Sequence, residues 1–257
     1  MKQAILAVSF GTAHPDTLEK TIRPTEAALR AEFPELPVLR AFTSPTIRKK
    51  LAQEQGIRVP SVEEVLEQLV REGCEQVLVQ PTLLLEGFEY DRLKQTLEGY
   101  RSRIGIRLGR PLLWEGADLG RAAAFLRECY APDPDTVLLM MGHGTEHPAN
   151  GIYNRLGEQM KALDGACLRL CTVEGVPTFA DAVAELQKQS RRKVILAPLL
   201  LVAGEHAKND MAGPQPESLR SMLEAAGFCV ECRLQGLGEQ AEIRRIYCER
   251  LRGAEAL

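Results

Sequence analysis

The sequence predicts an α/β fold made of two similar Rossmann-like domains, in which helices flank parallel sheets. Three observations support this prediction. Short apolar runs alternate with longer amphipathic runs along the chain, a pattern typical of parallel sheets that are covered on both faces. A motif at residues 11–15 returns at residues 144–148. The 257 residues are 45% hydrophobic and 26% charged, which is ordinary for a globular chain.

The expected strands are short runs rich in β-branched residues or leucine. They lie at residues 4–8, 38–42, 76–81 and 104–108 in the first half, and at 137–141, 167–173, 193–198 and 229–233 in the second. Because helical patterns separate these runs, the strands are expected to be parallel.

The expected helices are longer amphipathic patterns between the strands. They lie at residues 16–32, 45–55, 62–72, 89–100, 116–129, 149–163, 178–189, 216–226 and 239–252. The third of these shows the pattern most clearly, because Val62, Val65, Leu66 and Leu69 recur at the spacing of one helix face. Ser61 before it and Glu64 have the spacing of a capping box.

An internal repeat sets the expected number of domains. Residues 77–89 are echoed by residues 194–206, and Ser44-Pro45-Thr46 is echoed by Val176-Pro177-Thr178, in the same order in both halves. Two units with matching order predict two domains, at residues 1–125 and 126–257, rather than a solenoid of many short repeats. The cleft between paired domains is the expected place for a ligand and for the active site.

Composition and missing motifs exclude several functions. A formal net charge of −3 and 5% aromatic residues give no sign of a nucleic-acid or membrane partner. The sequence contains no phosphate loop and no dinucleotide fingerprint, so no nucleotide is expected. Most of the seven cysteines lie beside apolar residues, which suits a reducing compartment. With no signal peptide or membrane span, the protein is expected in the cytoplasm, and a homo-oligomer is left open.

The chain has only four histidines, and they follow the repeat unevenly. His14 and His147 occupy equivalent positions in the two halves and precede prolines, which favours a structural role in turns. His143 and His206 have no such counterparts, because the first half has Phe10 and Glu89 at the matching positions. The second half is therefore the candidate for histidine chemistry.

Three expected strand ends in the second half carry candidate metal ligands. His143 lies between Gly142 and Gly144, which leave its imidazole unshielded. Glu174 follows the next strand, and His206 follows the one after that. Asp210, four residues after His206, is placed to orient its ring if this loop turns helically. Two imidazoles and a carboxylate suit a divalent transition metal.

The motifs around these residues resemble a known family. Met141-Gly142-His143-Gly144-Thr145, Val173-Glu174-Gly175-Val176-Pro177 and the run from Gly204 to Gly213 are similar, in this order, to the anaerobic cobalt chelatases (CbiK) of the class II chelatase family. Ser9-Phe10-Gly11-Thr12 and the chain length match as well. The resemblance implies two chelatase-type domains and ATP-independent insertion of Co²⁺ into sirohydrochlorin for cobalamin synthesis.

The resemblance also implies roles for individual residues. His143, His206 and Glu89 are expected to act in catalysis, and His143, Glu174 and His206 to bind the metal. The residues expected to contact the tetrapyrrole are Phe10, Gly11, Thr12, Glu89, Arg92, Gly142 and Gly144. Co²⁺ is the expected metal substrate, although Fe²⁺, Ni²⁺ and Zn²⁺ suit the same ligands. The basic runs at residues 48–50 and 191–193 are further candidates for binding substrate carboxylates.

Two other functions use the same residues. One is a sirohydrochlorin ferrochelatase of sirohaem synthesis, and the other is a non-catalytic protein that binds a metal or a tetrapyrrole. A metal-dependent hydrolase is disfavoured, because the sequence has no H-E-x-x-H motif.

Overall fold

The computed structural model describes residues 2–114, 116–165 and 167–257, and the chain divides into two compact units. The first unit comprises Met1–Leu112 and Gly238–Leu257, and the second comprises Leu113–Leu237. This division differs from the expected domain ranges of 1–125 and 126–257. The chain returns to the first unit at its end because helix α10 (Ala241–Arg252) packs on α2 (Arg23–Glu32) and on strand β3 (Gln76–Pro81).

The first unit is built on a five-stranded sheet with the order β2-β1-β3-β4-β9. Strands β1 (Gln3–Ser9), β2 (Val38–Phe42), β3 (Gln76–Pro81) and β4 (Gly105–Leu108) are parallel, as expected. Six consecutive residues of β1 are buried, which is the pattern of a central strand covered on both faces. The short strand β9 (Glu255–Ala256), which was not expected, pairs antiparallel with β4.

The helices of the first unit follow the expected positions with one interruption. The segment expected as one helix at residues 16–32 consists of α1 (Pro15–Thr17), a π-helical turn η1 (Leu18–Ile22) and α2. The others are α3 (Pro45–Gln55), α4 (Val62–Arg71), α5 (Phe88–Glu98) and the 3₁₀ turn η4 (Leu237–Glu239) at the unit boundary. The capping box of Ser61 and Glu64 forms at the start of α4.

The second unit repeats this arrangement. Its sheet has the order β6-β5-β7-β8 and is parallel throughout, with strands β5 (Thr136–Gly142), β6 (Leu168–Thr172), β7 (Lys193–Pro198) and β8 (Cys229–Cys232). In both units the first strand of the unit takes the second place in the sheet. The common order, 2-1-3-4 within each unit, confirms the predicted α/β class and the internal repeat.

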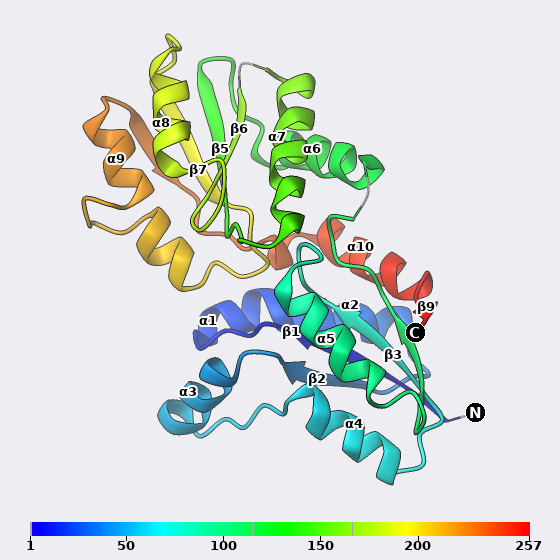
Figure 1. The fold of residues 1–257 in the computed structure, drawn as a ribbon. Helices are drawn as coiled ribbons and strands as arrows, with labels where there is room; N and C mark the ends of the chain where they lie inside the picture. The colour runs from blue at the N-terminus through cyan, green and yellow to red at the C-terminus, as the bar shows by residue number, and fades with distance from the viewer. Residues whose placement is uncertain (1, 115, 166) are drawn as a thin grey trace. The chain divides into compact units, whose positions relative to one another are not determined.

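Helices lie on both sides of this second sheet. Figure 1 shows α6 (Gly116–Tyr130) and α7 (Gly151–Leu163) together on one side, and α8 (Phe179–Gln187) and α9 (Leu219–Ala225) on the other. A 3₁₀ turn, η2 (Pro148–Asn150), leads into α7, and a π-helical turn, η3 (Ala207–Met211), follows β7. The core includes Val137, Leu139 and Met141 of β5, which are almost completely buried. None of the described helices has the length and apolar character needed to cross a membrane.

A buried carboxylate ties α2 to the edge strand β2 in the first unit. Glu26 is almost completely buried and accepts two hydrogen bonds from Arg40, at 2.5 Å from Nε and 2.7 Å from Nη2. Arg30 also approaches Glu26, but at 3.5 Å and from an exposed position. The bidentate bond from Arg40 is therefore the contact that compensates for burying the Glu26 carboxylate.

We expect Arg40→Ala to lower the free energy of unfolding by about 2–4 kcal/mol, because it leaves Glu26 buried without its main partner. Arg30→Ala is the matched control and should cost less than about 0.5 kcal/mol, since exposed ion pairs contribute little. Urea denaturation of the two variants measures both values. Equal losses in the two variants would contradict the assignment.

Candidate functional site

The two unmatched histidines meet at one edge of the second sheet. Strands β5 and β7 are parallel neighbours, with Met141 opposite Pro198, so the loops that follow them start side by side. The ring centroids of His143 and His206 are 4.6 Å apart, and the ring planes lie at 88°. The two side chains are 42% and 38% exposed. The pair is therefore close enough to act together and remains accessible from solvent.

Sheet topology explains this meeting. After β5 the chain goes to β6 on one side, and it then crosses to β7 on the other side of β5. In open α/β sheets such a reversal separates the loops that leave two neighbouring strands, and ligands bind at the carboxyl ends beside it. His143 and His206 lie on the two loops that flank this reversal.

The third predicted ligand, Glu174, lies next to His143 but does not complete a ligand set. Its Oε2 atom is 3.7 Å from Nδ1 of His143, and its side chain is 59% exposed. Within residues 2–114, 116–165 and 167–257, no group of three His, Cys, Asp or Glu side chains is arranged to hold a metal ion. The structure brings the two imidazoles together and leaves the Glu174 carboxylate beside them.

Each histidine has a hydrogen-bonding partner at Nδ1. His143 Nδ1 lies 2.9 Å from the carbonyl oxygen of Gly144, and His206 Nδ1 lies 2.8 Å from Oδ2 of Asp210. The second contact forms because the loop after β7 does turn helically, which places residues four apart on one face.

A buried asparagine joins the loop of His143 to the loop of Glu174. Asn150 accepts a hydrogen bond from the Thr145 backbone N–H and donates one to the Val176 carbonyl, each at 3.1 Å. The Glu174 N–H also donates to the His143 carbonyl at 2.8 Å. Sequence reasoning missed Asn150, because an asparagine at the start of an expected helix is a common capping residue.

The glycines around His143 are needed for packing. A Cβ atom on Gly142 would lie 2.5 Å from the ring of Tyr153, and one on Gly144 would lie 2.6 Å from the backbone nitrogen of Gly175. Gly144 also has a φ of +79°, which other residues rarely adopt. The loop therefore requires glycine at both positions for packing. The substrate contacts predicted for Gly142 and Gly144 stay a prediction.

Tyr153 of α7 packs against the backbone of the same loop. Burial raises the pKa of Tyr153 to about 12, while hydrogen bonds from the backbone of Gly144 and His143 act in the opposite direction. The phenol is therefore protonated at neutral pH, and its buried side chain supports the backbone of the His143 loop. No sequence motif pointed to this residue, because the pattern predicts only a buried position on one face of an amphipathic helix.

The remaining predicted residues belong to the first unit. Phe10 follows β1 with 47% of its surface exposed, and Gly11 has a φ of +105° with the Phe42 ring where a Cβ would be. Thr12 is buried, and its hydroxyl accepts a hydrogen bond from the His14 N–H at 3.2 Å. These contacts describe a tight turn at the end of β1.

Glu89 and Arg92 lie one turn apart near the start of α5 in the same unit. Arg92 Nη1 donates to Glu89 Oε1 at 2.8 Å, and the Arg92 side chain is 73% exposed. The pair resembles an ordinary i,i+3 helix contact, so it is weakly held and free to rearrange. The catalytic role of Glu89 and the substrate contact of Arg92 stay predictions.

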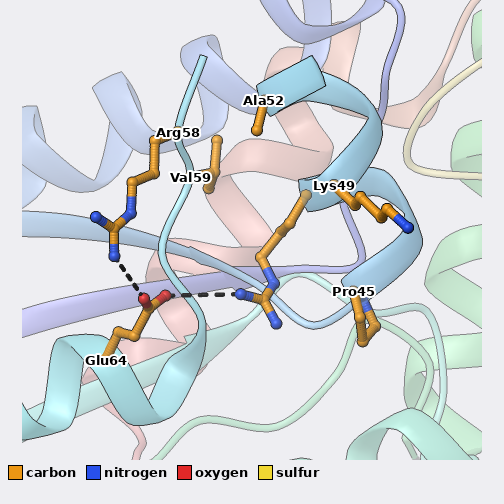
Figure 2. Close-up of a pocket in the computed structure, with 7 residues that line it drawn as sticks. Pro45, Lys49, Ala52, Arg58, Val59 and Glu64 are labelled. Atoms are coloured by element: carbon orange, nitrogen blue, oxygen red, sulfur yellow. Dashed lines mark hydrogen bonds and ion pairs between the residues drawn. The ribbon is translucent and has the colours of Figure 1, made fainter. Parts of the chain in front are cut away.

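The basic run at residues 48–50 borders a hollow of about 310 Å³ between α3 and α4, shown in Figure 2. Glu64 enters this hollow and pairs with Arg58 at 2.8 Å and with Arg48 at 3.6 Å. The Ser61 backbone N–H and the Arg58 guanidinium lower the pKa of the Glu64 carboxyl. Lys49 points away from Glu64. Of this run, Arg48 is thus paired with a carboxylate of the protein itself.

The second basic run lies at the wrong edge of its sheet to reach the histidines. Lys193 is the first residue of β7, whereas His206 follows the end of that strand. Arg191 and Arg192 donate to the backbone carbonyls of Pro134 and Gln189. This run therefore caps neighbouring backbone groups at the amino-terminal edge.

The fold and the histidine pair together define a class of protein. Each unit is a doubly wound parallel sheet, the second unit repeats the first, and two half-exposed imidazoles lie at the strand edge where such folds bind ligands. This is the architecture of an α/β protein built from two similar units, which binds its ligand at the carboxyl ends of its strands. A solved structure described as SirB from Bacillus subtilis with Fe³⁺ has this fold, with a TM-score of 0.64, 17% identity and coverage of 98% of this chain and 95% of that one.

The chain belongs to the cobalt chelatase (CbiK) family, whose model matches residues 3–256. It is 35% identical to the sirohydrochlorin cobaltochelatase of Salmonella typhimurium over 256 residues, covering 99% of this chain and 97% of that protein. It is also 35% identical to sirohydrochlorin cobaltochelatase CbiKC of Nitratidesulfovibrio vulgaris over 259 residues, covering 98% and 90%. The resemblance read from the motifs is confirmed at the level of the family.

We expect Gly144→Ala to destabilise the protein by about 1–3 kcal/mol, because a side chain at positive φ is strained and its Cβ would collide with Gly175. The matched control is Gly157→Ala in α7, where a new Cβ meets nothing within 4 Å. This second change should stabilise the protein by about 0.5–1 kcal/mol through the higher helix propensity of alanine. Thermal unfolding of both variants is the measurement, and an unchanged Gly144→Ala would rule out the packing argument.

Proposed function

We propose that this protein is a sirohydrochlorin cobaltochelatase, which inserts Co²⁺ into sirohydrochlorin without ATP in the anaerobic synthesis of cobalamin. The observation that carries the proposal is the pair of imidazoles 4.6 Å apart, in a chain that is 35% identical over nearly its full length to relatives of that name. Two nitrogen ligands on neighbouring loops provide a place where a borderline metal ion can be held and released.

The reaction exchanges one Co²⁺ for two protons of the macrocycle. The protein must therefore bind the ion, present it to the ring nitrogens and remove the pyrrole protons. A neutral imidazole can bind a metal ion, and once the ion has left it can accept a proton. His143 and His206 are assigned both tasks, and their partial exposure leaves a route for the protons to reach solvent.

Carboxylates are assigned supporting roles. Glu174 is proposed as the third metal ligand, because its exposed side chain beside His143 can turn toward an incoming ion and partly neutralise its charge. Glu89 is proposed to help in metal delivery or proton removal. Its Arg92 partner is proposed to bind a substrate carboxylate, since a guanidinium can bind such a group through two hydrogen bonds.

The substrate contacts proposed at the backbone turns are Phe10, Gly11, Thr12, Gly142 and Gly144. Phe10 offers an exposed aromatic ring for contact with an apolar face of a macrocycle. We place the reaction in the cytoplasm, because all seven cysteines are free, as suits a reducing compartment. Fe²⁺, Ni²⁺ and Zn²⁺ are proposed as competing metals.

We expect His143→Ala and His206→Ala to lower the rate of Co²⁺ insertion about 100-fold or more, since each removes a metal ligand and a base. The control is His147→Ala, because His147 Nδ1 accepts a hydrogen bond from the Ala149 N–H and acts as a helix cap. That variant should keep a rate within about threefold of the original. The absorbance change of sirohydrochlorin on mixing with Co²⁺ and enzyme measures the rates. Full activity in both test variants would refute the mechanism.

We expect Co²⁺ to be inserted faster than Fe²⁺ when the two metals compete for limiting sirohydrochlorin under anaerobic conditions. Metal content of the purified product gives the ratio directly. Because two imidazoles bind several divalent metals, the preference should be one of rate rather than of absolute exclusion. A product that contains mainly iron would identify the protein as a sirohydrochlorin ferrochelatase instead.

A further inference from the structure

We propose that Asp210 is a positioning residue, which holds His206 with its proton on Nδ1 so that Nε2 carries the lone pair offered to Co²⁺. The inference rests on the proposed function, since it assigns the orientation of one proposed metal ligand. It begins from a single contact, in which Oδ2 of Asp210 lies 2.8 Å from Nδ1 of His206.

The chemistry of the two groups fixes the direction of this hydrogen bond. An ionised carboxylate only accepts hydrogen bonds, whereas a neutral imidazole has one nitrogen that donates and one that accepts. Nδ1 must therefore carry the proton when it contacts Asp210. The lone pair is then on Nε2, the nitrogen at the other side of the ring. Carboxylates that contact metal-binding histidines orient their rings in this way.

The His143 ring is assigned the same tautomer, with its proton on Nδ1, through a different hydrogen-bond partner. Its Nδ1 lies 2.9 Å from the carbonyl oxygen of Gly144, which also only accepts hydrogen bonds. Both rings therefore carry their lone pairs on Nε2, while their centroids are 4.6 Å apart. Glu174 lies 3.7 Å from the Nδ1 atom of His143, so its carboxylate is on the protonated side of that ring. Asp210 is held against its histidine, and Glu174 is not.

The turn that carries His206 and Asp210 is anchored independently of their contact. Ala207 and Met211 of η3 are completely buried. Backbone hydrogen bonds from Lys208 to Gly204 and from Gly213 to Asn209 close the turn at 3.0 and 2.9 Å. Because Asp210 is partly exposed, its hydrogen bond to His206 adds little to stability. Its effect is therefore expected on the orientation of the ring and not on the fold.

The same turn supplies a matched control. Asn209 Nδ2 donates to Glu205 Oε1 at 2.6 Å, again between residues four apart. That contact does not involve His206. Replacing Asn209 removes a neighbouring i,i+4 hydrogen bond from the turn and leaves the Asp210 contact in place.

The first measurement is the tautomer of His206 in the metal-free full-length protein, by long-range ¹H–¹⁵N correlation at about pH 8.5, where ordinary imidazoles are neutral. We expect the Nδ1–H form in the unaltered protein and in Asn209→Ala. Asp210→Ala should shift His206 toward the Nε2–H form, and Asp210→Asn should be intermediate, because an amide can accept or donate. An Nε2–H tautomer in the unaltered protein, or no change in Asp210→Ala, would overturn the proposal.

The second measurement is Co²⁺ binding to the same proteins, followed by the visible absorption of the bound ion. Asp210→Ala should weaken binding about 10- to 100-fold, the usual effect of removing such a partner, and Asn209→Ala should not weaken it. Equal affinities for Asp210→Ala and the control would also overturn the proposal. A failure of the unaltered enzyme to convert sirohydrochlorin would contradict the proposed function alone, because the tautomer and Co²⁺ titrations are read without substrate.

Discussion

The parallel pairing of β5 with β7 is the constraint on which the candidate site depends. It brings the ends of two strands that are far apart in the sequence to one edge, with Met141 opposite Pro198. The chain reaches β6 before it returns to β7, so the two loops leave this edge in different directions and their histidines can face each other. A different strand order would separate the histidines, even if every helix and strand kept its length.

Much of the fold could be predicted from the sequence, because the strands are buried apolar runs with helical patterns between them. The exceptions have physical reasons. The two π-helical turns, at Leu18–Ile22 and Ala207–Met211, depart from the 3.6-residue period on which helix prediction relies. Strand β9 is two exposed residues defined only by its pairing with β4. The return of α10 to the first unit depends on its packing against α2, which is far away in the sequence, and local sequence patterns do not predict such a contact.

Some residues of the candidate site could likewise be predicted from the sequence, and others could not. His143 and His206 could be found because the repeat lacks histidine at the matching positions, and that comparison needs only the sequence. Asn150 and Tyr153 could not be found, since they act on the backbone of the His143 loop and carry no motif. The glycines were noticed for a different reason from the one the structure gives, because steric contact with Tyr153 and Gly175 depends on the folded packing.

The proposed donor set suits a metal ion that is passed on to a substrate rather than kept by the protein. Closed structural metal sites use four ligands, often thiolates, whereas here two half-exposed imidazoles face each other with one carboxylate nearby. A cysteine is present in the same sheet, because Cys171 of β6 lies opposite Met141. Cys171 is completely buried, which raises the pKa of its thiol and leaves the thiol inaccessible to an incoming ion. In the proposed mechanism, imidazole nitrogens bind the divalent ion without the extra charge attraction of thiolates, which would slow its release to a macrocycle.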